Sequence, residues 1–252
     1  MDLTAYEEIG GGTHGQAPIL FLCDHATNRV PPDVAGGDLG LPPEEMARHI
    51  AYDIGARGVT LALARLLRAS ALLTRFSRLV IDPNRGEDDP TLVMRLYDGT
   101  IIPANRHVSR AEVERRLDAW HRPYHRAIDA AIDRITAAWR APALVSIHSY
   151  TPQLKGRPPR PWEVGILWHH DGRIARPLID RLRADGYRVG DNEPYSGELE
   201  GDTMSRHGTG RGLAHVLIEV RQDLIATEHD QGLWAARLAP ILMQAIEEIP
   251  HG

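Results

Sequence analysis

The sequence predicts an α/β fold, a three-layer sandwich in which helices flank a mixed, mainly parallel sheet. Three short apolar runs carry this prediction: residues 18–23, 143–147 and 215–220. Each has the length and composition of a strand buried inside a parallel sheet. Stretches with helical spacing separate the runs, and no repeat or linker-like change in composition interrupts the chain. One domain over residues 1–252 is therefore the simplest organisation.

The first half of the chain is expected to begin with a glycine-rich lead-in loop and the first strand. A helix should open at Pro42-Pro-Glu-Glu45, because proline and acidic residues favour a first turn, and it should carry His49 and Asp53. The remaining expectations are a helix at 56–68, strands at 70–75 and 79–81, a charged turn at 82–90 and irregular structure at 95–107.

The second half begins with a helix whose start has a capping box, Ser109 followed by Glu112. This helix should run to about residue 140, and Pro123 should kink or split it. We then expect a proline-rich loop or lid at 151–162, a strand at 164–168, a helix at 172–185 and a loop at 201–212. A final helix, capped by Thr227-Glu-His-Asp230, should reach about residue 248.

The overall composition is that of a globular protein. Of 252 residues, 42% are hydrophobic and 25% are charged, and the net charge of −5 argues against nucleic acid as the main partner. Neither a signal peptide nor an apolar membrane span is visible, so we expect a cytoplasmic protein with no membrane partner. Cys23 is the only cysteine, which excludes an intrachain disulfide.

Reactive side chains stand at or near the carboxyl ends of the three predicted strands, where ligands bind in open α/β sheets. These side chains are His25, His148 and Glu219. Amide hydrolysis at neutral pH suits a bound Zn²⁺ or another divalent metal with histidine ligands and a nearby carboxylate that takes up a proton. The alternatives are hydrogen-bonded structural histidines, and a Glu219 that only pairs with Arg221.

An arginine-rich segment adds a site for an anion. Asn84 and Arg85 follow each other on a turn constrained by proline, and Arg78 lies seven residues before Arg85. A guanidinium fork matches a carboxylate, so one arginine can hold a substrate carboxylate while another stabilises an oxyanion. The alternative is a solvated turn in which Arg85 pairs with Glu87 or Asp88.

Five motifs together resemble the N-formylglutamate amidohydrolase family over about residues 17–225. They are Asp24-His-Ala-Thr-Asn28, Ser77-Arg-Leu-Val-Ile-Asp-Pro-Asn-Arg85, His121-Arg-Pro-Tyr-His125, Ile147-His-Ser149 and Glu219-Val-Arg221. The resemblance implies a fold like that of the zinc exopeptidases. It also implies His25 and His148 as metal ligands, Asn84 and Arg85 for the substrate carboxylate, Glu219 as base, and Arg78 on the scissile carbonyl.

One position departs from the exopeptidase pattern, which has a glutamate ligand three residues after the first histidine. Here that residue is Asn28, a poor zinc ligand. We expect Asp53 to supply the missing oxygen, with His49 as second choice. His125, Tyr150 and Arg221 complete the expected substrate-binding set.

The expected function is hydrolysis of a small N-acyl amino acid, most concretely N-formyl-glutamate to formate and glutamate, in amino-acid catabolism. Two alternatives stay open. One is a related hydrolase of another acylated amine or short peptide, and the other is a non-catalytic small-molecule-binding protein on the same scaffold. The sequence leaves the oligomeric state open.

Overall fold

A seven-stranded sheet forms the centre of the computed structural model, which describes residues 4–10, 17–138 and 142–249. The strands are β1 (Tyr6–Ile9), β2 (Ile19–Cys23), β3 (Ser70–Thr74), β6 (Ala143–Tyr150), β7 (Val164–Leu167), β8 (Val189–Asp191) and β9 (His215–Arg221). Their order is β1-β3-β2-β6-β9-β7-β8. Strands β3, β2, β6 and β9 run parallel, whereas β1 and β7 are antiparallel to their neighbours β3 and β9. The predicted mixed, mainly parallel sheet is confirmed.

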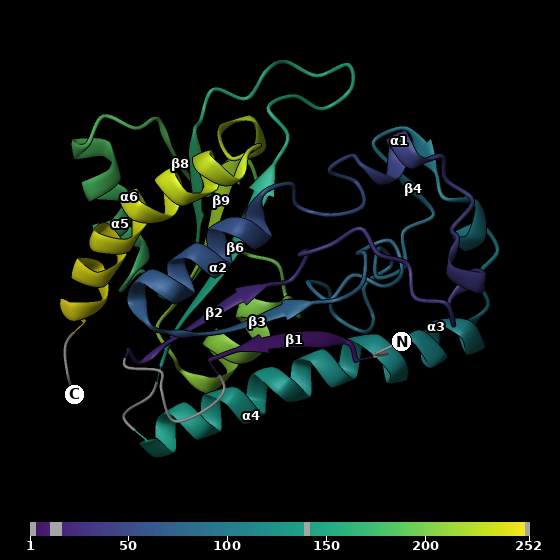
Figure 1. Cartoon of the computed structure of the whole chain (residues 1–252), viewed down its shortest axis with the longest axis horizontal. Coiled ribbons are helices and arrows are strands. Elements are labelled where there is room, and N and C mark those ends of the chain that lie inside the picture. The colour runs from purple at the N-terminus through teal and green to yellow at the C-terminus, as the bar shows by residue number, and fades with distance from the viewer. Residues whose placement is uncertain (1–3, 11–16, 139–141, 250–252) are drawn as a thin grey trace.

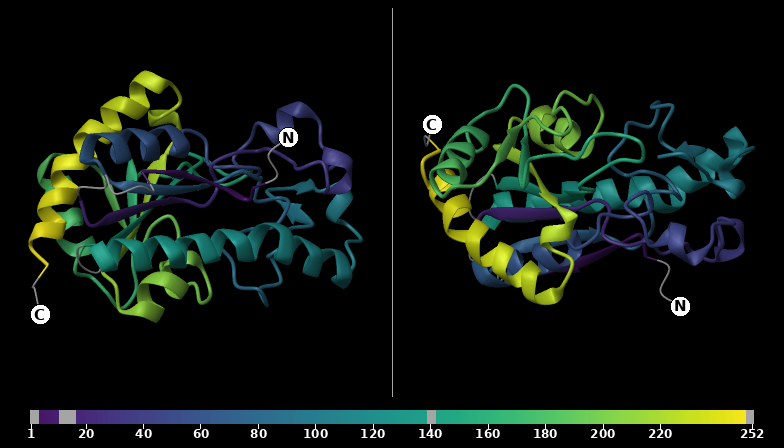
Figure 2. Two further views of the ribbon diagram at one scale, coloured as in Figure 1. Left: turned by 60° about the horizontal axis from the view of Figure 1, so that its bottom comes forward. Right: turned by 90° about the horizontal axis from the view of Figure 1, so that it is seen from above.

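Helices cover both faces of this sheet (Figures 1 and 2). One face carries α2 (Ala56–Leu67), α5 (Ala175–Ala184) and α6 (Glu228–Glu247), and the other carries α4 (Arg122–Ala138), which continues α3 (Arg110–Arg116). The two faces follow from alternation along β9: Val216, Ile218 and Val220 pack with the first group, and Leu217 packs toward α4. The predicted three-layer arrangement is therefore present.

Short elements complete the chain. They are α1 (Pro43–Met46), the β4–β5 hairpin (Leu96–Tyr97 and Thr100–Ile101), π-helical turns at Leu117–His121 and Met204–Gly208, and 3-10 turns at Ala35–Gly37, Pro103–Asn105, Thr209–Arg211 and Gln222–Leu224. The second π turn covers the same face of the sheet as α4. Its Met204 belongs to the apolar cluster that contains Leu167, Leu217 and residues of α4.

Several local predictions were wrong. The helix expected to carry His49 and Asp53 ends at Met46, and both residues lie in the turns that follow. Residues 79–81 form turns instead of a strand, because the Ser77 hydroxyl and carbonyl accept hydrogen bonds from the amides of Leu79 and Val80. The edge strands β1 and β8 were not predicted.

The long helix from Ser109 continues through Pro123, where a kink or a split was predicted. A π-helical turn at Leu117–His121 joins α3 to α4 instead, and Pro123 occupies the second position of α4. The predicted caps are confirmed at both helices: Ser109 accepts a hydrogen bond from Glu112 N, and Thr227 accepts one from Asp230 N.

Candidate active site

Three buried side chains converge at the carboxyl ends of β2 and β6. His25 follows β2, His148 lies in β6, and Asp53 lies in the turn before α2. The Nδ1 atoms of His148 and His25 lie 2.8 and 3.2 Å from the same Oδ2 of Asp53. One potential ligand atom from each residue lies within 4.8 Å of the others. Two imidazole nitrogens and a carboxylate oxygen match the three-ligand sets of catalytic zinc sites.

The opposite nitrogen of each imidazole is held by its own carboxylate. His25 Nε2 lies 2.7 Å from Asp82 Oδ1, and His148 Nε2 lies 3.0 Å from Asp24 Oδ2. Both carboxylates are fully buried. Such carboxylate–histidine pairs fix the ring and turn the other nitrogen toward a metal. The residues therefore fit a divalent cation at the Nδ1 side, with the Nε2 protons donated outward.

The carboxylate of Asp24, which faces His148 Nε2, is itself held by two hydroxyl groups. Asp24 accepts hydrogen bonds from Tyr124 Oη at 2.8 Å and Ser146 Oγ at 3.0 Å. Although burial opposes its charge, the hydrogen bond from His148 lowers the pKa of Asp24 to about 2. Burial likewise opposes the charge of His148, yet its hydrogen bonds to Asp24 and Asp53 raise its pKa well above the usual value. The cluster thus holds its carboxylates ionised at neutral pH.

Glu219 is the unusual carboxylate of the site. It is the register partner of His148 in the parallel β6–β9 pair, is only 6% exposed, and lines the cavity. Its Oε2 has no hydrogen-bond partner among the residues the structure describes. Burial raises its pKa to about 7, although the nearby His148 acts in the opposite direction. A buried oxygen left without a partner points to a ligand or proton exchange at this position.

Arg78 ties the turn at 77–85 to the histidine cluster. Its Nε and one terminal nitrogen donate to Asp82 Oδ2 at 3.1 and 2.7 Å, and its other terminal nitrogen lies 3.7 Å from Asp53 Oδ1. Burial disfavours the charge, but Asp82 keeps the pKa of Arg78 above its ordinary value. Arg78 is therefore a permanent buried cation at the cavity wall.

Asn84 and Arg85 line the same cavity on the adjoining turn. The backbone amide of Thr203 donates to Asn84 Oδ1 at 3.1 Å, so the Nδ2 group remains as the donor that a carboxylate needs. Arg85 donates to the Thr91 hydroxyl and to the Asn84 carbonyl. These contacts fix both side chains beside the cluster.

A second histidine cluster lies behind this turn. His125 Nε2 donates to the Pro83 carbonyl at 3.0 Å, and His125 Nδ1 lies 2.8 Å from His207 Nε2. His207 Nδ1 in turn lies 3.0 Å from Asp129 Oδ1. Burial lowers the pKa of both rings. The pair links α4 to the turn that carries Asn84 and Arg85.

Three residues expected to bind substrate lie outside the cavity lining. His125 is fully buried behind the 77–85 turn. The Tyr150 hydroxyl donates to the Trp162 carbonyl, and Arg221 pairs with Asp223 and also reaches Trp162. The Arg221 guanidinium is directed to Asp223 and to the Trp162 carbonyl, so it does not pair with Glu219 among the residues that the structure describes. His49, the second choice as ligand, lines the cavity but lies 3.6 Å from Asp98 instead of joining the cluster.

Sequence reasoning missed three acidic residues of the site: Asp24, Asp82 and Asp202. Asp24 directly precedes His25 and Asp82 precedes the Asn84-Arg85 pair, so both stood inside the motifs already singled out. Asp202 lies outside those motifs, so nothing in the sequence pointed to it. It lines the cavity, accepts a hydrogen bond from Ser205 N, and burial raises its pKa to about 6.

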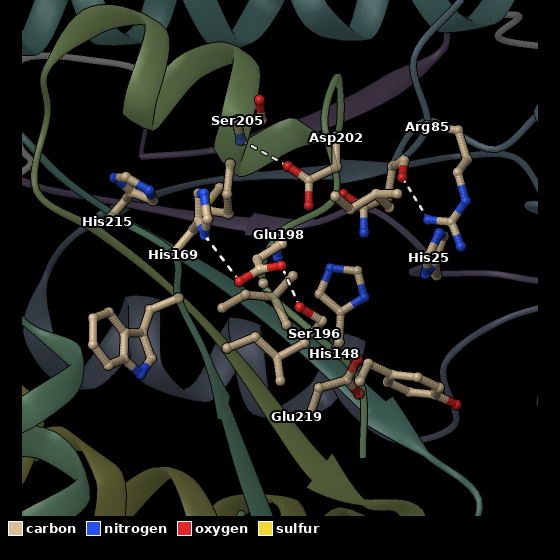
Figure 3. A pocket seen from close by; sticks show the side chains of 18 of the residues that line it. His25, Arg85, His148, His169, Ser196, Glu198, Asp202, Ser205, His215 and Glu219 are labelled. Atoms are coloured by element: carbon tan, nitrogen blue, oxygen red, sulfur yellow. Dashed lines mark hydrogen bonds and ion pairs between the residues drawn. The ribbon is translucent and has the colours of Figure 1, made fainter. Parts of the chain in front are cut away.

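His25, Asp53, Arg78, His148 and Glu219 border a cavity of about 440 Å³ (Figure 3). A mixed α/β sheet that presents a histidine–carboxylate cluster at its strand ends, beside the buried Arg78 and the part-buried Arg85, is an arrangement suited to a hydrolase that cleaves amide bonds. The family model described as N-formylglutamate amidohydrolase matches residues 17–226. The chain therefore belongs to the N-formylglutamate amidohydrolase family, and the predictions of this family and of an enzyme acting on amide bonds are confirmed.

Individual relatives agree with this assignment. The chain is 29% identical to N-formylglutamate deformylase of Pseudomonas aeruginosa, over 96% of this chain and 95% of the relative. It is 32% identical to gene product Atu2144 of Agrobacterium tumefaciens, whose crystal structure superposes with a TM-score of 0.91 over 98% of this chain and 96% of that one. N-formylglutamate amidohydrolase of Ralstonia eutropha shares the fold, with a TM-score of 0.67, 23% identity, and coverage of 96% and 99%.

Within the described ranges, no helix combines the length and the apolar character that crossing a bilayer requires.

Proposed function

We propose that this protein is a metal-dependent amidohydrolase that cleaves N-formyl-glutamate to formate and glutamate. The observation that carries the proposal is the meeting of His25, Asp53 and His148 within 4.8 Å, beside the unpartnered buried carboxylate of Glu219. The names of the Pseudomonas relatives supply the substrate. A cytoplasmic location, a catabolic role and a single domain stay predictions from the sequence.

A divalent ion, most concretely Zn²⁺, would be held by the Nδ1 atoms of His25 and His148 and by a carboxylate oxygen of Asp53. When bound, such an ion polarises the scissile carbonyl and makes water more acidic. The protein's own contribution is to hold the two rings through Asp82 and Asp24, so that both Nδ1 atoms face one point.

Glu219 acts as the proton carrier. Because its pKa is about 7, both forms of Glu219 are accessible at neutral pH: the ionised form accepts a proton from water, and the protonated form gives it up. Attack of that water on the amide carbon breaks the C–N bond, and the proton held by Glu219 passes to the departing nitrogen. Formate and the free amine of glutamate then balance the reaction.

The arginine segment holds the substrate's charges. The Nδ2 group of Asn84 and the guanidinium of Arg85 are placed for a carboxylate of the substrate, since charge-assisted and amide hydrogen bonds suit that group. Arg78 keeps one terminal nitrogen on the cavity side, where it steadies the negative charge that develops on the carbonyl oxygen.

The test uses purified protein, metal analysis and an assay that follows formate and glutamate from N-formyl-glutamate. We expect one divalent ion per chain and turnover that a chelator abolishes and Zn²⁺ restores. Glu219→Gln should lower kcat by a factor of about 10² or more, as the loss of a general base does. Glu247→Gln makes the same change at an exposed position of α6 and should leave kcat unaltered. Full turnover by Glu219→Gln would contradict the mechanism.

One alternative is a non-catalytic binding protein on this scaffold. It would bind N-formyl-glutamate without turnover in the presence of any divalent ion, so the same assay combined with calorimetry separates the two functions. The other alternative is a hydrolase of different acylated amines, and kinetic comparison of several N-acyl-glutamates tests it.

A further inference from the structure

The cavity extends well beyond the histidine cluster. His215, Leu217 and Glu219 alternate along β9, so they point to the same face of the sheet, and all three line the cavity. Since a strand advances about 3.3 Å per residue, the cavity follows β9 for about 13 Å from Glu219 to His215. We call the part beyond Glu219, lined by Leu167, Met204, Thr209, His215 and Leu217, the far arm.

The two ends of the cavity differ in chemistry. Arg78 and Arg85 are the only lysine or arginine side chains among the described lining residues, and both stand at the cluster end. Figure 3 shows Arg85 and His25 at one side, His169 and His215 at the other, and His148 and Glu219 between them. Leu167, Met204 and Leu217 belong to one buried apolar cluster. The far arm is therefore apolar along its floor, without a fixed cation.

The remaining polar groups of the far arm are already engaged. His215 Nδ1 donates to the Leu213 carbonyl at 2.8 Å, and its Nε2 lies 3.3 Å from the Thr209 hydroxyl, an arrangement that a neutral imidazole satisfies. At the rim, Glu198 lies 3.6 Å from His169. A carboxylate entering this arm would meet Glu198 at the rim and, among the described lining residues of the arm, no arginine or lysine.

We propose that the far arm binds the acyl group of the substrate, and that neutral aliphatic acyl groups of several carbons are substrates in addition to formyl. The proposal rests on the proposed amidohydrolase function. A planar trans amide sends its two substituents in opposite directions from the scissile bond. With the amino acid's carboxylate at Asn84 and Arg85, the acyl substituent leaves the cluster toward Leu217.

The dimensions suit a chain of moderate length. An extended chain advances about 1.2 Å per bond, so the five bonds beyond the carbonyl of a hexanoyl group span about 6 Å. That length ends near Leu217, two residues from Glu219 and short of the polar end at His215. Each methylene buried there should tighten binding about fourfold, whereas a terminal carboxylate should cancel the gain.

The experiment compares N-formyl-, N-acetyl-, N-butyryl-, N-hexanoyl- and N-glutaryl-glutamate on the metal-loaded enzyme, measuring kcat and KM, with Kd from calorimetry on Glu219→Gln. We expect KM and Kd for the hexanoyl compound to lie at least tenfold below those for the acetyl compound. The glutaryl compound, which ends in a carboxylate, should bind no better than the acetyl one.

A pair of leucine variants then locates the effect. Leu217→Phe narrows the far arm, whereas Leu213→Phe makes the same change in the same apolar cluster but outside the cavity lining. The readout is the ratio of kcat/KM for the hexanoyl and formyl compounds, because general loss of folded enzyme cancels in it. Leu217→Phe should lower this ratio at least tenfold, and Leu213→Phe should leave it within a factor of two.

The outcomes separate the two proposals. If the enzyme cleaves the formyl compound and kcat/KM falls more than a hundredfold from formyl to butyryl, the acyl arm is overturned while the amidohydrolase function stands. If no compound is cleaved, the function fails, and the Kd series alone decides the arm: equal Kd values for acetyl and hexanoyl compounds overturn it, and a tenfold gain for hexanoyl supports it.

Discussion

Glu219 and His148 are direct register partners in the parallel pairing of β9 with β6. Neighbouring side chains on one face of a sheet point the same way, so the carboxylate and the imidazole enter the cavity together. His148 is held by Asp24 and Asp53, whereas Glu219 Oε2 has no described partner. Pairing of the two strands thus sets an imidazole held on both sides beside a carboxylate oxygen that no described residue occupies.

The first prediction concerns stability and pH. Folding raises the pKa of Glu219 from 4.5 to about 7, so the native state binds its proton more tightly than the unfolded state. The stability associated with this proton is fully present below pH 4.5 and is lost as the pH rises through 7. In metal-free protein, Glu219→Gln should therefore be more stable than wild type at pH 8, by up to about 3 kcal/mol. Urea unfolding at pH 5 and pH 8 tests this, and an advantage that is larger at pH 5 would contradict it.

The second prediction concerns the metal. Asp53→Asn removes the one carboxylate that both Nδ1 atoms face, so it should weaken Zn²⁺ binding at least a hundredfold and abolish the rise in Tm that Zn²⁺ produces in wild type. Competition with a chromophoric chelator gives the affinity. Asp185→Asn, at an exposed position after α5, is the matched control and should bind Zn²⁺ like wild type. Equal affinity in Asp53→Asn would exclude Asp53 as a ligand.

The third prediction concerns the second histidine cluster. His207→Ala leaves His125 without its ring partner and loosens the Pro83 carbonyl that His125 holds, and this turn carries Asn84 and Arg85. KM for N-formyl-glutamate should rise about tenfold while zinc content stays at the wild-type level. Arg211→Ala removes a surface contact to the same Asp129 and should change neither value. A loss of zinc with unchanged KM would show that the cluster supports the ligands instead of the turn.

The fourth prediction concerns Gly165, which stands opposite Glu219 on β7. A β-carbon there would lie 2.2 Å from the Glu193 carbonyl oxygen, so alanine must push back the chain that leads to the Tyr195–Ser196 wall of the cavity. Gly165→Ala should destabilise the fold by about 1–3 kcal/mol and lower activity. Gly232→Ala, at a helical position of α6 with open space, should stabilise it by about 0.5–1 kcal/mol. Thermal unfolding and turnover of both variants check the opposite signs.

The sequence predicted the parts of the fold that depend on periodicity. The strands β2, β6 and β9 each contain an apolar run, and the Ser109 and Thr227 caps are local patterns that need no partner in the rest of the fold. The edge strands β1 and β8 were not predicted, because each is short and its extended conformation depends on hydrogen bonds to the neighbouring strand. Residues 79–81 were mistaken for a strand because apolar burial in a compact turn resembles burial in a sheet.

In the candidate site, too, the residues at strand ends were predictable, whereas the contacts between side chains were not. His25, His148 and Glu219 could be placed from strand ends, and the structure brings them to one cavity with Asp53. The roles of Asp24 and Asp82 could not be read, since they depend on which ring nitrogen each carboxylate faces. Tyr150 and Arg221 are the last residues of β6 and β9, yet both side chains donate hydrogen bonds to the Trp162 carbonyl instead of lining the cavity.

The anchoring of both imidazoles by carboxylates on two sides has a consequence for how the protein would take up the proposed divalent ion. Hydrogen bonds to Asp24 and Asp53 raise the pKa of His148 well above its usual value and so favour the ring with a proton on both nitrogens. A cation arriving at Nδ1 must displace that proton. Loading should therefore acidify a weakly buffered solution, and acid should strip the ion by competition for the same nitrogen while the ring stays where Asp24 holds it.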